Sequence, residues 1–152
     1  MCLIMVVSVT ACGRSEDMVQ TEDDDGNIEI GFTFDSFIIE RWERDRDVFV
    51  SRAHELGVDV NVQNANGDVD TQISQIEYFI EKRVNAIVIV AVDCQALSGV
   101  IAKAHRAGIK VISYDRLISD ANTDLFISFE ERKGMTRKEL HSWFFLILLY
   151  NV

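Results

Sequence analysis

Polar side chains of the types that bind hydroxyl groups follow the apolar runs of this sequence. They combine carboxylate, amide and guanidinium groups, and they are Asp35, Arg41, Asn64, Asp93, Asp115 and Arg116. Carboxylate and amide oxygens accept the proton of a hydroxyl, whereas arginine and amide N–H groups donate to its oxygen. Aromatic rings such as Trp42 stand nearby, and their faces suit the C–H side of a sugar ring. The set therefore predicts a binding site for a neutral sugar.

Most of these residues also fit a purely structural role. Asp35 is equally suited to cap a helix, and Arg41 to pair with a neighbouring acid on the surface. Trp42 has the spacing of a core residue, and Asn64 lies in a sequence rich in turn residues. The pair Asp115–Arg116 follows directly after a predicted buried strand and is the strongest candidate for ligand contact.

The sequence offers no catalytic or metal-binding constellation. The histidines and cysteines are scattered and fit neither a zinc pattern nor a disulfide framework, and no serine or cysteine has a visible base partner. The formal net charge of −10 argues against a nucleic-acid partner. We therefore expect a protein that binds a ligand, with no enzyme activity, no cofactor and no metal.

Apolar periodicity predicts strands that alternate with helices. The run 28–34 reads as a buried strand, and the polar residues Asp35 and Ser36 then interrupt it as a candidate helix N-cap. Apolar residues next recur at helical spacing, at Ile38, Trp42, Phe49, Ala53 and Leu56. The same unit repeats downstream: strands are expected at 58–63, 86–92, 110–114 and 125–129, and helices at 71–82 and 95–107.

This alternation predicts an α/β fold with a doubly wound parallel sheet of order 2-1-3-4-5. In such a sheet, ligands bind at the carboxyl ends of the strands, which is where the polar residues are expected. Gly31 lies within the first strand, and no glycine-rich phosphate loop follows it. A nucleotide enzyme is therefore disfavoured.

The two ends of the chain differ from this core. Residues 1–11 are apolar and read as a partial lipoprotein signal peptide, because Val9-Thr10-Ala11-Cys12 resembles a bacterial lipobox in which Cys12 receives lipid. Residues 12–27 are polar and acidic, as expected of a flexible tether. An ordinary frayed apolar end is the alternative.

Five segments of the core together resemble the D-xylose-binding proteins of bacterial ABC sugar importers, which are type I periplasmic binding proteins. They read Ile-Gly-Phe-Thr-Phe-Asp at 30–35, Glu-Arg-Trp at 40–42 with Asp-Arg-Asp at 45–47, Gln-Asn-Ala-Asn-Gly at 63–67, Thr-Gln-x-x-Gln-Ile-Glu at 71–77, and Ile-x-Tyr-Asp-Arg-Leu-Ile at 112–118. The resemblance covers about 28–130. It departs at Ser36, where the family has a second acid, and at Ala91 and Asp93, where it commonly has proline and asparagine.

The resemblance implies a fold of two α/β lobes that hold a sugar between them, of which 28–130 matches the N-terminal lobe. By similarity, Arg41, Asp115 and Arg116 fall where the family contacts its sugar. A truncated extracytoplasmic lipoprotein is then expected, with a pentose as ligand and an ABC permease as partner. The alternative partner is the extracellular domain of a sensor histidine kinase.

Residues 131–152 form an atypical tail. The resemblance stops before them, and the apolar run 143–150 is shorter than the roughly 18 residues typical of a membrane span. We expect this tail to result from a frame change or premature stop. A docking or membrane-associating segment is the alternative.

Overall fold

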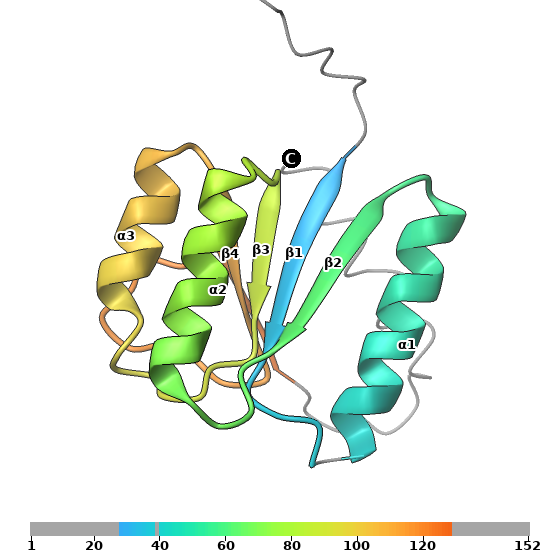
Figure 1. Ribbon diagram of the computed structural model, residues 1–152, viewed down its shortest axis with the longest axis horizontal. Helices are drawn as coiled ribbons and strands as arrows, with labels where there is room; N and C mark the ends of the chain where they lie inside the picture. The colour runs from blue at the N-terminus through green and yellow to red at the C-terminus, as the bar shows by residue number, and fades with distance from the viewer. Residues whose placement is uncertain (1–27, 39, 129–152) are drawn as a thin grey trace, which may run out of the picture.

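The computed structural model describes residues 28–38 and 40–128, which fold as alternating strands and helices (Figure 1). The elements in chain order are β1 (Glu29–Phe34), α1 (Glu40–Glu55), β2 (Asp59–Asn64), α2 (Val69–Glu81), β3 (Ala86–Ile89), α3 (Ser98–Arg106), β4 (Lys110–Tyr114) and β5 (Leu125–Ile127). This order confirms the predicted alternation. In the described part of the chain, no helix is both long enough and apolar enough to cross a membrane.

The strands form one sheet of order β2-β1-β3-β4-β5, and all of its pairings are parallel. The register places Ile30 of β1 opposite Val60 of β2 on one side and Ala86 of β3 on the other. The predicted order 2-1-3-4-5 is therefore confirmed. Because all strands run the same way, the residues after β1, β3 and β4 meet at one edge of the sheet.

Helices cover both faces of the sheet, with α1 on one side and α2 and α3 on the other (Figure 1). The central strand β3 and the residues after it show how the two cores divide, because successive side chains point to opposite faces. Val88 and Val90 belong to the core that includes Trp42 and Phe49 of α1. Ile87 and Ile89 belong to the core beneath α2 and α3. The fold is thus doubly wound, as predicted.

One glycine is required by close packing between β1 and α2. A Cβ atom on Gly31 would lie 2.5 Å from the Cγ atom of Phe79, which is closer than such atoms approach. Phe79 is itself completely buried. The absence of a side chain in the middle of β1 therefore allows α2 to sit against the sheet at this point.

Several predicted boundaries are wrong by a few residues. Helix α1 begins at Glu40, so Asp35 and Ser36 do not cap it. Ile38 lies before the helix and is 87% exposed, and Leu56 lies after it and is also exposed. The spacing placed both in the buried stripe, but a stripe holds only within the helix that creates it.

Other elements are also shorter than the sequence predicts; β5, for example, ends at Ile127 within the predicted strand 125–129. Strand β3 ends at Ile89 instead of residue 92, because the chain leaves the sheet at the site described below. Helix α3 begins at Ser98 instead of residue 95, after a turn. Gly57 confirms the predicted end of the first helix, since its φ of +73° is the left-handed conformation that glycine favours at this position.

The predictions for the chain ends fall outside the described residues. These are the signal-like segment 1–11 with the lipidation site Cys12, the tether 12–27 and the tail 131–152. They stay predictions.

Candidate functional site

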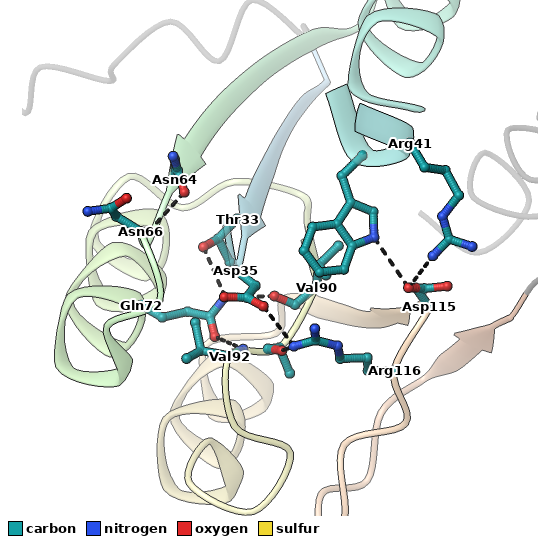
Figure 2. A network of polar contacts seen from close by, with 12 residues as sticks. Thr33, Asp35, Arg41, Asn64, Asn66, Gln72, Val90, Val92, Asp115 and Arg116 are labelled. Atoms are coloured by element: carbon teal, nitrogen blue, oxygen red, sulfur yellow. Dashed lines mark hydrogen bonds and ion pairs between the residues drawn. The ribbon is translucent and has the colours of Figure 1, made fainter. Parts of the chain in front are cut away.

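Four of the predicted polar residues meet at the carboxyl edge of the sheet (Figure 2). Asp35 follows β1, Asp115 and Arg116 follow β4, and Arg41 lies in the first turn of α1. They form two ion pairs, Arg41 with Asp115 and Arg116 with Asp35. Residues far apart in the sequence are thus joined because parallel strands end together.

Asp115, the acid of the first ion pair, accepts hydrogen bonds from two side chains. Its Oδ2 atom accepts hydrogen bonds from Arg41 Nη2 and from the indole Nε1 of Trp42, the latter at 3.2 Å. Its backbone has a φ of +65°, a left-handed conformation that aspartate tolerates better than most residues. Its N–H donates to the Ile127 carbonyl at 2.7 Å. The carboxylate is therefore held both through its side chain and through its backbone.

Arg116 ties three strand ends together. Its Nη1 atom donates to Asp35 Oδ2 at 2.8 Å and to the Ala91 carbonyl at 2.7 Å. Its guanidinium lies 4.9 Å from the centre of the Trp42 ring, within the range of a cation–π contact. About a third of the side chain is exposed (35%), so the group is positioned by the protein and still reaches solvent.

Trp42 lies in the core and supports the polar residues from below. It is 1% exposed, with its N–H directed to Asp115 and its ring beneath Arg116. The structure therefore matches the core explanation of Trp42. Little of its ring is available as an open surface for a sugar, and any contact between Trp42 and ligand stays a prediction.

Asn64 and Asp93 shape turns. The Asn64 Oδ1 atom accepts from the backbone N–H of Asn66 at 2.9 Å, and the Asp93 Oδ1 atom accepts from the backbone N–H of Gln95 at 2.7 Å. Both contacts are local Asx-type turns. They account for these two residues without a ligand, and the predicted ligand role of each remains untested.

The sequence reasoning assigned no role to two buried polar residues that shape the site. Gln72 of α2 is 0% exposed and bonds the backbone on both sides of Ala91. Ser113 of β4 is also 0% exposed; its hydroxyl donates to the Arg116 carbonyl and accepts from the Ile118 N–H. A signal for Gln72 existed, since it lies one helical turn before the buried Ile76 on the apolar side of α2.

Tyr114, the last residue of β4, is a buried and uncharged neighbour of the site. It is 2% exposed, and burial raises the pKa of its phenol, with a further increase from the negative charge of Asp45. The hydroxyl therefore stays protonated at physiological pH. Within residues 28–38 and 40–128 there is no group of three or more His, Cys, Asp or Glu side chains that could hold a metal ion.

The solvent-reaching charges of the site are paired. Among the side chains that reach solvent, two guanidinium groups face two carboxylates. Asp45 is a further carboxylate beside Tyr114, but it is only 2% exposed. Donors and acceptors nevertheless alternate around a small area, which suits groups that both donate and accept. Such an arrangement fits a neutral ligand with several hydroxyls.

Comparison with known proteins shows which proteins this chain is similar to. The model of the family described as "Periplasmic binding protein domain" matches residues 30–134. The D-xylose-binding periplasmic protein of Escherichia coli K12 is 47% identical over 106 residues, which are 70% of this chain and 32% of that protein. The multiple sugar-binding periplasmic receptor of Rhizobium radiobacter is 39% identical over 94 residues, or 61% of this chain and 27% of that protein.

A solved structure agrees with these relatives. The ABC transporter solute-binding protein of Clostridium phytofermentans, solved with bound β-D-glucose, superposes with a TM-score of 0.65 at 32% identity. The superposition covers 67% of this chain and 32% of that protein. The chain thus spans about a third of the length of the E. coli relative and of this structure.

Proposed function

The chain belongs to the periplasmic binding protein family, and on that premise we propose that it forms the N-terminal lobe of an extracytoplasmic sugar-binding protein that serves an ABC importer. The observation that carries the proposal is the pair of ion pairs at the carboxyl edge of the sheet, with Arg116 over Trp42. The proposed work is binding, without any reaction. D-xylose is the proposed ligand, because the relative with 47% identity is described as a D-xylose-binding protein.

In the proposed complex, the two carboxylates accept from sugar hydroxyls and the two arginines donate to them. The ion pairs use the Oδ2 atom of both Asp35 and Asp115, which leaves each Oδ1 atom to accept from a hydroxyl. Charge-assisted hydrogen bonds of this kind are roughly twice as strong as neutral ones. A second lobe would cover the opposite side of the sugar and close over it, as in hinge closure around a ligand.

Titration of the ¹⁵N-labelled chain with D-xylose, followed by NMR, tests the proposal. We expect weak binding, with a Kd of about 1 mM or higher, since one lobe supplies only part of the contacts. The shifts should concentrate on the indole N–H of Trp42 and the side chains of Arg41 and Arg116. Arg116→Met should remove them, whereas Arg106→Met, at an exposed position of α3, should not.

Two outcomes would contradict the proposal or its one-lobe form. Equal shifts with the acyclic polyol D-mannitol, or shifts scattered away from the sheet edge, would exclude a sugar site here. A micromolar dissociation constant with one site by calorimetry would show that a second lobe is not needed.

Sugar sensing is a second candidate, and one relative favours it, because the R. radiobacter protein is described as a receptor. In this form the same lobe would dock on the extracellular domain of a sensor kinase. Gene neighbours discriminate the two: permease and ATPase genes favour import, and a kinase gene favours sensing.

We also propose that Cys12 anchors the protein to a membrane through lipid. The support is the sequence around Cys12 and the acidic segment that follows it. Membrane fractionation after expression with the native N-terminus should place the chain in the membrane fraction, and Cys12→Ala should release it.

A further inference from the structure

Gln72 reaches from α2 to the segment that leaves the sheet after β3. Its Nε2 donates to the Val90 carbonyl at 3.0 Å, and its Oε1 accepts from the Val92 N–H at 2.9 Å. Its Nε2 also lies 3.4 Å from the hydroxyl of Thr33 in β1. A single amide thus holds the backbone immediately before and after Ala91.

Ala91 provides a backbone acceptor for Arg116. The Ala91 carbonyl accepts from Arg116 Nη1 at 2.7 Å, from the same atom that pairs with Asp35 (Figure 2). The orientation of that carbonyl therefore depends on the backbone on either side. Gln72 bonds both flanks, and the Thr33 carbonyl of β1 also accepts from the Val90 N–H, at 2.9 Å. No other described side chain bonds both flanks of Ala91.

We propose that Gln72 is a positioning residue of the sugar site, which sets the direction of the Arg116 guanidinium through the backbone of residues 90–92. The amide suits this task because it presents one donor and one acceptor in a fixed plane. The site relevance of this role rests on the proposed function. The geometric link from Gln72 to Arg116 does not, and it is measurable without any sugar.

Gln75 provides a matched control on the same helix. Its Nε2 donates to the Asn64 carbonyl at 2.9 Å, and its Oε1 accepts from the Thr33 hydroxyl at 2.7 Å. It therefore shares Thr33 with Gln72 but binds the last residue of β2 instead of the segment after β3. Substitution of Gln75 removes a comparable set of hydrogen bonds without touching Ala91.

The test compares Gln72→Met with Gln75→Met in the full chain, by NMR without ligand. Methionine has a similar length and cannot make the hydrogen bonds. In Q72M we expect amide exchange of Val92 to rise at least 10-fold and the ring-current shift of the Arg116 side chain over Trp42 to fall by half or more. In Q75M both should stay within error of the wild type.

Two results would overturn the proposal: an unchanged Arg116 shift in folded Q72M, or an equal change in Q75M. If Q72M does not fold, Gln72→Glu decides the question, because a protonated glutamic acid again offers one donor and one acceptor. Q72E should then match the wild-type Arg116 shift at low pH and lose it as the acid ionises. Wild-type spectra at each pH correct for Asp35 and Asp115, and no recovery at low pH would contradict the proposal.

Sugar titration separates this inference from the proposed function. If neither the wild type nor any variant responds to D-xylose, the proposed function fails while the Arg116 result still stands. If the wild type responds and the Arg116 shift is insensitive to Gln72, the positioning role alone is wrong.

Discussion

At the scale of single residues, Asp115 shows how the site is held. It accepts from Trp42 and Arg41 while its backbone adopts a φ of +65°. The position thus requires a side-chain acceptor and a left-handed backbone, and few residue types provide both. Asparagine tolerates the left-handed backbone and keeps a side-chain acceptor. Glycine tolerates the backbone but has no acceptor, and alanine provides neither.

Substitutions at Asp115 should therefore fall in a definite order of stability. Asp115→Asn should cost less than about 1 kcal/mol, since Trp42 retains an acceptor. Asp115→Ala should cost about 1–3 kcal/mol more than D115N, because the indole N–H is left buried without a partner and the left-handed backbone is strained. Urea unfolding measures these differences. Equal stability of D115N and D115A would contradict the account.

Asp115→Gly separates the two contributions. It removes the acceptor but relaxes the backbone, so its stability should lie between those of D115N and D115A, about 1 kcal/mol above D115A. A value below that of D115A would mean that the left-handed conformation carries no strain.

At the scale of elements, the packing of α2 against β1 depends on a missing side chain. A Cβ on Gly31 would meet three atoms of the Phe79 ring at 2.5–2.8 Å. The ring is buried and cannot move aside without displacing the helix. The distance between sheet and helix on this face is thus fixed by one glycine.

Gly31→Ala should destabilise the fold by about 1–3 kcal/mol, the usual cost of overpacking a core. Gly99→Ala is the matched control: Gly99 lies in α3, and a Cβ there would have nothing within 4 Å. This control should gain about 0.5–1 kcal/mol from higher helix propensity. Chemical unfolding of both variants checks the pair, and a neutral G31A would refute the close-contact argument.

A second feature at this scale is the carboxylate of Asp124, which connects β4, β5 and α3. Asp124, just before β5, accepts from the Val111 N–H at 2.9 Å, and it lies 3.0 Å from His105 Nε2 and 3.2 Å from Lys110 Nζ. Burial alone would raise the pKa of Asp124, but the hydrogen bonds from Val111, Lys110 and His105 outweigh it and lower the pKa below its usual value.

The lowered pKa gives a definite pH dependence. The carboxylate stabilises the fold fully above its unfolded pKa of about 3.9, and this stabilisation is lost as the pH falls through the lower folded pKa. The free energy of unfolding of the wild type should therefore exceed that of Asp124→Asn by about 1 kcal/mol or less at pH 5. The gap should shrink below about pH 4, and a gap that widens there would contradict the assignment.

At the scale of the whole molecule, the site lies at an edge of the sheet, and its solvent-reaching charges are already paired. Two arginines and two aspartates satisfy one another without a ligand. The chain spans about a third of the length of the E. coli relative. The proposed function therefore assigns to this lobe one half of a binding surface.

A chimera tests that division. Residues 30–128 replace the matching part of the D-xylose-binding periplasmic protein of E. coli, and calorimetry with D-xylose measures binding. We expect a Kd in the micromolar range, and a loss of roughly 10- to 150-fold with Arg116→Met, because a charge-assisted hydrogen bond contributes about 1.5–3 kcal/mol. Arg106→Met is the control, and a folded chimera that does not bind D-xylose would exclude this ligand.

The fold was largely predictable from the sequence, because each strand and helix has its own local pattern. The alternation of elements and their order in the sheet follow from it and are confirmed. Boundaries were less predictable where tertiary contacts decide them. Ile38 fits a helical stripe by spacing, yet it is 87% exposed because α1 starts two residues later.

The site was predictable only in part. Strand ends brought Asp35, Asp115 and Arg116 together, since position in a parallel sheet is a topological property. Which arginine pairs with which aspartate could not be predicted, because acids that lie close together compete for the same arginine. Gln72 was missed for a different reason: a buried glutamine looks like a solvent-facing one until the backbone it binds is known.

The position of Arg116 above Trp42 has a practical consequence, since it places a charge beside a fluorophore. Indole emission responds to nearby charge, so any movement of this guanidinium changes the colour and intensity of the light that Trp42 emits. The chain has two tryptophans, Trp42 and Trp143, and replacing Trp143 with phenylalanine leaves one emitter. The protein then carries its own label-free optical sensor for the state of its sheet edge.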